Sequence, residues 1–81
     1  MQSRPSAEHC AGAILSILVL HFASRPGDTL RSISFDPVWR RRGYRATDFE
    51  SGVGFAIKHD WLEALSDGKS YRLNKKGHAA A

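Results

Sequence analysis

The stretch RRRGYRATDFESGVGFAIKHDWLEALSDGKSYRLNKKG, from Arg40 to Gly77, decides the fold of this 81-residue chain. It opens with basic residues and continues with a segment whose apolar residues recur at helical spacing. It closes with two short runs separated by Asp67-Gly68, in which apolar and polar residues alternate. This order predicts a short basic helix, a tight turn, a second helix and a two-stranded hairpin. The expected class is therefore α+β.

The pair Asp67-Gly68 fixes the register of the predicted hairpin. Asp-Gly favours a two-residue turn in which both central residues have positive φ, so Ser66 is expected opposite Lys69. The pairs that follow along the two strands are Ala64 with Tyr71, Glu63 with Arg72, and Leu62 with Leu73. Opposed residues share a face of the sheet, so one face is apolar and the other carries an exposed Glu63–Arg72 pair.

The segment before the hairpin carries the signals of a capped helix. Thr47 is the predicted N-cap, and Glu50 three residues later completes a capping box. Gly52 lies beside the apolar stripe, where it would let another helix approach closely. The stripe consists of Phe49, Val53, Ala56 and Ile57. The opposite face holds Thr47, Ser51, Gly54, Phe55 and Lys58, and we expect Phe55 to be at least partly exposed.

Further upstream, Asp36-Pro37 predicts the start of the short basic helix, with Asp as N-cap and Pro at the first helical position. This helix would run through Arg42 and end at Gly43, which would adopt the left-handed conformation common just after a helix. The loosely alternating segment Thr29 to Phe35 predicts a short edge strand that adds to the hairpin.

The N-terminal part predicts another helix, with Ser6 as N-cap and Arg25-Pro26-Gly27 as the stop signal. Between them, Ala11 to Ala23 contains no charged residue. This pattern has three interpretations: a buried first helix, a secretory apolar region preceded by Arg4, and a membrane span. The run falls short of the ~20 residues that a span needs. We favour the buried helix, because the predicted second helix needs an apolar cover.

This first helix is apolar on more than one face, which is typical of a helix that is central or covered by a partner. A central position among three helices is one interpretation, and a homodimer seam is the other. Cys10 is expected to be a small buried hydrophobe, and His21 a partly buried core residue. One cysteine excludes an internal disulfide and suits a reducing compartment, so a cytoplasmic location is expected.

Several segments together resemble the second half of bacterial winged-helix domains: Arg45 to Phe49, Phe55 to Ile57, His59 to Leu62, Tyr71 to Leu73, and Gly77. Such domains run from a recognition helix through a Gly-Trp-Leu-like strand start and a wing to a Leu-Thr-x-x-Gly close. Here Asp60 replaces the Gly and Asn74 replaces the Thr. The resemblance covers roughly residues 7 to 77. It implies one winged helix-turn-helix domain, residues 1–81 with an ordered core of about 6–77, built from three helices and a C-terminal hairpin wing.

The charge of the chain predicts a function for this domain. Lys and Arg number 12 against 8 Asp and Glu, which gives a net charge of +4 and a pI near 9.7. Such a surface suits salt-dependent binding to the phosphates of double-stranded DNA. The predicted DNA-binding residues are Arg40, Arg41, Arg42, Arg45, Thr47, Ser51, Lys58, Lys69 and Arg72. The expected protein is a small transcriptional regulator. The alternative is a protein-interaction module in which Phe55 and the first helix make the contacts.

Enzymatic and metal-binding functions have little support in the sequence. One Cys and four His show no C-x-x-C or H-x-x-x-H spacing. Gly52-Val53-Gly54 falls within the predicted helix, and no Lys-Ser/Thr follows it as in a phosphate-binding loop. We therefore expect no catalytic site, no metal, no cofactor and no membrane partner.

Overall fold

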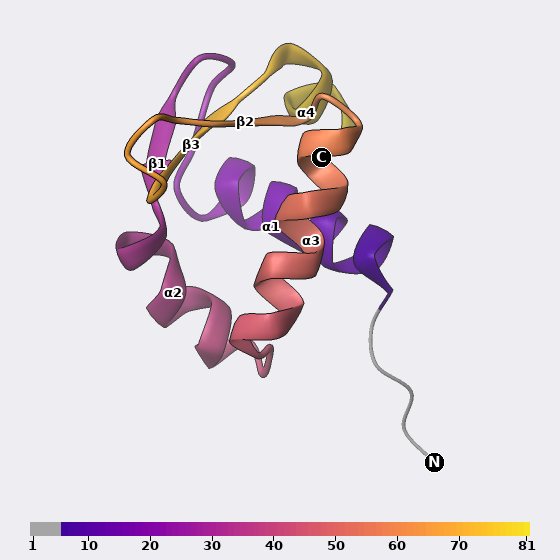
Figure 1. Ribbon diagram of the computed structural model, residues 1–81, viewed down its shortest axis with the longest axis vertical. Helices are drawn as coiled ribbons and strands as arrows, with labels where there is room; N and C mark the ends of the chain where they lie inside the picture. Colours follow the sequence, from indigo (N-terminus) through magenta and orange to yellow (C-terminus); the bar gives the residue numbers. More distant parts are fainter. Residues whose placement is uncertain (1–5) are drawn as a thin grey trace.

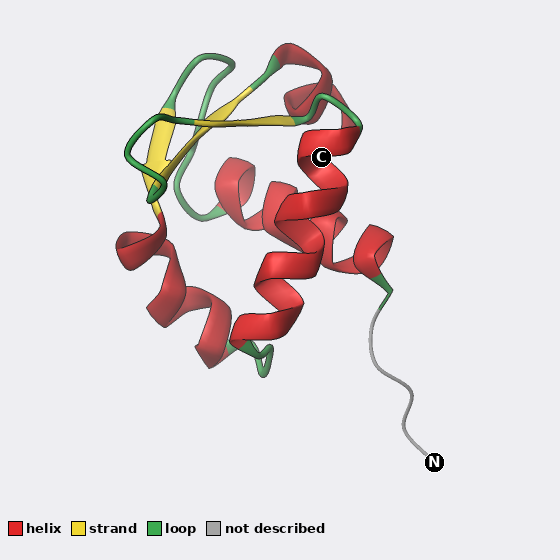
Figure 2. Ribbon diagram, viewed as in Figure 1, coloured by secondary structure: helices red, strands yellow, loops and turns green. Residues whose placement is uncertain are grey.

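The computed structural model describes residues 6–81 (Figure 1). Arg4, which belonged to the secretory interpretation, lies outside the described residues. The elements follow in the order α1 (Ala7–Leu20), β1 (Thr29–Arg31), α2 (Ser32–Arg41), α3 (Ala46–Lys58), β2 (Leu62–Ala64), β3 (Ser70–Leu73) and α4 (Lys75–Ala80). The predicted α+β class is confirmed. Helices α1, α2 and α3 gather on one side of a small sheet, and α4 lies near the C-terminal end of α3 (Figure 2).

The hairpin register predicted from Asp67-Gly68 is confirmed, but the predicted turn is wrong in part: Gly68 has φ +70°, whereas φ of Asp67 is not positive, and the Gly68 N–H donates to the Leu65 carbonyl at 3.1 Å. Strands β2 and β3 are antiparallel, with Leu62 opposite Leu73, Glu63 opposite Arg72 and Ala64 opposite Tyr71. The carboxylate of Glu63 lies 3.4 Å from the Arg72 guanidinium on the exposed face. The predicted apolar face of the hairpin is confirmed in part. Leu62 and Leu73 are buried and Tyr71 is half-buried. Ala64, at the end of the edge strand β2, is exposed.

The predicted third strand is also present, but it is shorter than expected. Strand β1 pairs with β3 and gives the sheet the order β1-β3-β2. The chain enters α2 at Ser32, so the predicted helix start at Asp36 is wrong and Pro37 lies inside the helix. The reason is a long-range contact: the Ser32 N–H donates to the carbonyl of Lys69 at 2.8 Å.

The ends of α2 and α3 follow the local signals to different degrees. Gly43 ends α2 as predicted, with φ +89°. The predicted capping box of Thr47 and Glu50 is wrong, because α3 begins two residues before Asp48 and its N-cap is Arg45. The Asp48 carboxylate accepts a hydrogen bond from the Arg45 N–H at 3.0 Å. Asp48 therefore takes the role that had been assigned to Glu50.

Helix α1 begins as predicted, since the Ser6 hydroxyl accepts a hydrogen bond from the His9 N–H at 3.0 Å. It ends at Leu20, before the predicted stop. Ala23 has φ +52°, and the Ser24 N–H donates to the Leu18 carbonyl. This early turn leaves His21 exposed, which corrects its expected place in the core.

Residues 78–81, which follow the predicted ordered core, were expected to be loose, but helix α4 extends over Lys75–Ala80. Gly77 is buried against the backbone of Trp61, where a Cβ would meet the Trp61 carbonyl oxygen and lie 3.0 Å from Leu73 Cδ1. The Asn74 N–H donates to the same Trp61 carbonyl at 3.0 Å. A fourth helix was missed because tertiary contacts at Trp61, rather than a periodic apolar pattern, hold it.

The core centres on α1, as the interpretation of a central helix predicts. Cys10 is fully buried, and burial raises the pKa of its thiol above the ordinary value, in agreement with the predicted small hydrophobe. The buried apolar residues are Cys10, Ala11, Ile14, Leu15, Ile17 and Leu18 of α1, Phe35 and Trp39 of α2, Val53 and Ala56 of α3, and Leu62 and Leu73 of the hairpin. None of the helices among residues 6–81 has both the length and the apolar character that crossing a membrane requires.

The buried stripe of α3 is rotated from the predicted one. Phe49, Val53 and Ala56 face the core, but Ile57 is 41% exposed and Gly52 is buried. At 100° per residue, Ile57 lies about 90° from the centre of the buried face. The reason is that α1 closes directly on Gly52, where a Cβ would lie 2.8 Å from the Cys10 carbonyl carbon and 2.9 Å from the Ala11 nitrogen.

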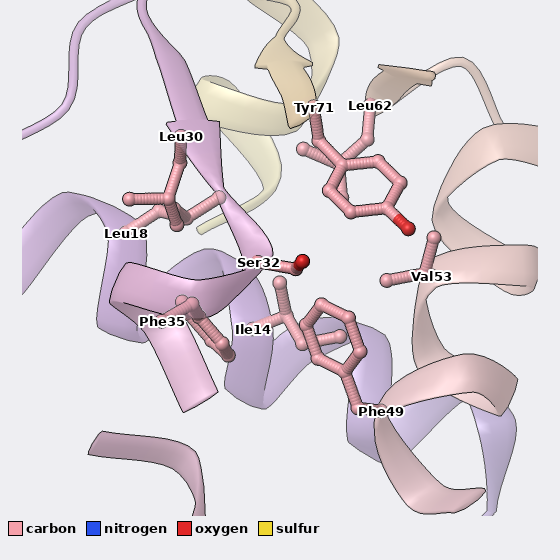
Figure 3. Close-up of a pocket in the computed structure, with 9 residues that line it drawn as sticks. All are labelled: Ile14, Leu18, Leu30, Ser32, Phe35, Phe49, Val53, Leu62 and Tyr71. Carbon is pink, nitrogen blue, oxygen red and sulfur yellow. The ribbon is translucent and has the colours of Figure 1, made fainter. Parts of the chain in front are cut away.

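A small cavity remains where the sheet meets the three helices (Figure 3). Its lining includes Ile14 of α1, Phe35 of α2, Val53 of α3 and Tyr71 of β3. The volume is about 10 Å³, roughly the space that one water molecule occupies. It is a packing gap in the core and is too small for an organic ligand.

Two glycines of α3 give a matched test of this packing. Gly52→Ala should destabilise the domain by about 1–3 kcal/mol, because its methyl group overlaps the α1 backbone. Gly54→Ala should stabilise the domain by up to about 1 kcal/mol, because a Cβ there meets nothing within 4 Å and alanine favours a helix. Urea denaturation of both variants checks the pair, and equal effects at the two positions would contradict the close α1–α3 contact.

Candidate nucleic-acid interface

The turn between α2 and α3 is held from inside by Trp39. This side chain is fully buried, and its Nε1 donates to the carbonyl of Arg45 at 2.8 Å. Its ring stacks on Tyr44 with 4.1 Å between the centroids. Together with the Arg45–Asp48 hydrogen bond, these contacts fix the backbone on both sides of Arg45 and leave its side chain exposed.

The same turn is tied to the start of α1. The hydroxyl of Tyr44 lies 3.1 Å from Nε2 of His9, within hydrogen-bond distance. Tyr44 is therefore held between the Trp39 ring and α1. A turn fixed at two points presents its neighbouring side chains on a rigid backbone, which limits the entropy lost when they bind a ligand.

The four arginines around this turn, Arg40, Arg41, Arg42 and Arg45, are all exposed, and we call them the turn cluster. Arg40 Nε lies 2.9 Å from the carboxylate of Asp36, one helical turn earlier. Within residues 6–81, the other three arginines form no ion pair with an acidic side chain. Their charges are thus available to an anionic partner.

A second group of cations lies at the tip of the hairpin. Lys69 is exposed in the turn, and Arg31 at the end of β1 pairs with Ser70. These two residues border a surface hollow of about 270 Å³ beside the first residues of α2, and we call them the tip cluster. Arg31 is not among the predicted DNA-binding residues, because only the long-range pairing of β1 with β3 brings it to the hairpin.

Asp67 organises this hairpin tip. Its carboxylate accepts hydrogen bonds from the Lys69 N–H at 2.9 Å, from the Ser70 N–H at 2.9 Å and from the Ser70 hydroxyl at 2.7 Å. The Lys69 N–H and then the Ser70 hydroxyl are the main causes that hold the pKa of the Asp67 carboxyl below its ordinary value of 3.8. The Arg31 charge acts in the same direction. The tip is consequently a fixed turn with two outward cations.

The remaining predicted residues lie on α3 and on strand β3. Thr47, Ser51 and Lys58 are exposed on its outer face. Arg72 is exposed on the sheet, where Glu63 partly neutralises it. The nine predicted residues are therefore all on the surface, but they divide into the turn cluster, the outer face of α3 and the hairpin.

Phe55 borders the outer face of α3 and is half-buried, so the expected partial exposure is confirmed. Its ring stacks on His59 with 4.1 Å between centroids and lies 5.5 Å from the ring of Trp61. The alternative of a protein-interaction module predicts a binding partner for this side chain. The structure supplies two aromatic neighbours within the same chain.

The two cation clusters are separated by the length of α2. The first residue of α2, Ser32, is hydrogen-bonded to the Lys69 carbonyl at the hairpin tip, and the last residue of α2 is Arg41 of the turn cluster. Figure 1 shows the course of α2 between these two points. Ten residues of helix span ~15 Å. This separation is similar to the ~12 Å width of the major groove of B-DNA.

Other kinds of site find no support within the described residues. Among residues 6–81, no group of three His, Cys, Asp or Glu side chains could hold a metal ion. In the same range, every buried side-chain nitrogen or oxygen has a hydrogen-bond partner. The surface of the described residues does carry exposed cations and a few exposed apolar side chains.

No family model matches the sequence, and no curated protein or solved structure is significantly similar to it. The function must therefore be inferred from the charge and geometry of the chain itself.

The hydrogen bonds of Asp67 predict an acid-sensitive hairpin. A carboxyl group whose pKa is lowered in the folded state stabilises the protein above its unfolded value of 3.8, and this contribution is lost as the pH falls through the lower folded value. In Asp67→Asn, the free energy of unfolding should fall less than in the wild type between about pH 5 and pH 2. Denaturant titrations across this range check it, and parallel pH profiles would contradict the assignment.

Proposed function

We propose that this chain is a winged helix-turn-helix domain of the bacterial type that binds double-stranded DNA as a small transcriptional regulator. The order of elements supports the fold assignment: α1, β1, α2 and α3 precede the β2–β3 hairpin, and β1 pairs with β3. In this assignment α2 and α3 are the helix-turn-helix, and the hairpin is the wing.

The observation that carries the proposal is the pair of rigidly held cation clusters about one groove width apart. Arg41, Arg42 and Arg45 are exposed at one end of α2, and Arg31 and Lys69 are exposed at the other. Phosphates on the two sides of a groove could engage both clusters at once. Such contacts fix the position of a protein on the duplex but do not read its sequence.

The hairpin is short, which restricts what the wing can do. Strand β3 pairs with β1 over Ser70 to Arg72, and the Lys69 carbonyl is bonded to the first residue of α2. The wing therefore does not extend far beyond the sheet. Its role in this proposal is to hold Arg31 and Lys69 against the phosphate backbone, while α3 faces the bases.

A double substitution in the turn cluster tests the proposal. Arg41→Ala/Arg45→Ala should weaken binding to every duplex and lower the slope of log K against log salt concentration by ~2, since each lost phosphate contact removes ~0.9. Titration of a random duplex at several salt concentrations measures this slope.

The control is Lys75→Ala/Lys76→Ala, which removes two positive charges from α4 near the other end of α3. Of these two lysines, Lys76 lies 3.7 Å from the Asp60 carboxylate. The control should keep a slope close to the wild type. Equal losses in both variants would indicate diffuse attraction and would contradict a site at the turn. Salt-independent or undetectable duplex binding by the wild type would contradict DNA binding altogether.

A second candidate function is a protein-interaction module, and two exposed apolar residues favour it. Leu20 at the end of α1 and Ile33 near the start of α2 are 81% and 78% exposed. A contact through Leu20 would also fit a homodimer formed by the N-terminal helix. This candidate gains weight if duplex binding fails while Leu20→Ser or Ile33→Ser changes self-association measured by analytical ultracentrifugation.

A further inference from the structure

We propose that Glu50 is the residue through which α3 reads sequence, by accepting a hydrogen bond from the N4 amino group of a cytosine in the major groove. This inference rests on the proposed DNA-binding function and adds the base that the site prefers.

The composition of the exposed face of α3 leaves few residues able to read a base. This face consists of Ala46, Thr47, Glu50, Ser51, Gly54, Ile57 and Lys58. The Ala, Gly and Ile side chains cannot form hydrogen bonds, and Ser and Thr hydroxyls both donate and accept, so they discriminate bases weakly. Glu50 and Lys58 are the two long polar side chains that remain.

Glu50 and Lys58 differ in their position along α3. Lys58 is the last residue of α3, eight residues and therefore ~12 Å beyond Glu50. Glu50 lies on the second turn, close to Arg45 and the turn cluster that would grip the phosphates. A helix that enters the major groove beside this turn brings Glu50 to the base edges before Lys58.

The carboxylate of Glu50 is free to bind. Within residues 6–81, it is exposed and takes part in no hydrogen bond or ion pair. Asp48, by contrast, is held by the Arg45 N–H. A carboxylate that faces DNA without a donor would only repel phosphates, so its presence on this face calls for a donor on the duplex.

The hydrogen-bonding groups of the major groove favour cytosine as the partner of the Glu50 carboxylate. An ionised carboxylate can only accept hydrogen bonds. In the major groove, cytosine presents the N4 amino donor without an acceptor on its own edge, whereas adenine presents its amino donor beside the acceptor N7. Guanine and thymine present acceptors, which would repel the carboxylate.

The experiment is selection of bound duplexes from a random pool, followed by affinity measurements, for the wild type, Glu50→Gln and a control. The control, Glu8→Gln, makes the same chemical change on an exposed residue of α1. We expect the wild type and the control to enrich cytosine at one position. Replacing that C·G pair by T·A should weaken their binding roughly tenfold.

In Glu50→Gln, the two duplexes should bind within about threefold of each other, because an amide can both donate and accept. Wild-type binding without cytosine enrichment, or an unchanged preference in Glu50→Gln, would overturn the role of Glu50 and leave DNA binding intact. Absence of salt-dependent binding to any duplex by the wild type would overturn the proposed function, and this inference with it.

Discussion

The contact between Gly52 of α3 and the α1 backbone at Cys10 and Ala11 is the constraint on which the rest of the structure depends. A Cβ at Gly52 would lie within 3 Å of three atoms of α1. This close approach puts α1 in the middle of the domain, where its buried side chains support both α3 and the sheet. It also determines the rotation of α3, because the side that meets α1 is centred nearer Gly52 than Ile57. The contact with α1 on one side of α3 therefore determines which residues are exposed on its other side.

Trp39 connects the packing of the core to the surface turn between α2 and α3. A buried indole needs a partner for its N–H, and here the partner is the carbonyl of Arg45 in the turn. A hydrogen bond of this kind contributes about 1 kcal/mol to stability, but its position matters more than its strength. It links the packing of α2 to the backbone from which Arg45 projects. The turn cluster is thus placed by residues that no anionic partner would touch.

The sequence predicted best what short-range chemistry decides. The register of the hairpin agrees with the alternation of apolar and polar residues on either side of Asp67-Gly68, and the end of α2 follows from Gly43. The predictions failed where a distant residue competes with a local signal. Ser32 begins α2 because Lys69 accepts its N–H, and α4 forms because Gly77 fits against Trp61. Arg31 joined the candidate site for the same reason, since strand order cannot be read from β1 alone.

The charges of the candidate site also bear on how much of its proposed affinity for DNA depends on the base sequence. Arg40 and Arg72 form ion pairs with Asp36 and Glu63, whereas the other five cations of the two clusters form no ion pair within residues 6–81. Five phosphate contacts would give a salt slope of about −4.5, so raising salt from 50 to 200 mM would weaken binding about 500-fold. An interface of this kind draws its affinity from phosphates that every duplex carries. In the proposed complex, specificity would depend on the few side chains of α3 that reach a base edge, and the mostly small outer face of α3 would limit how many bases the domain could distinguish.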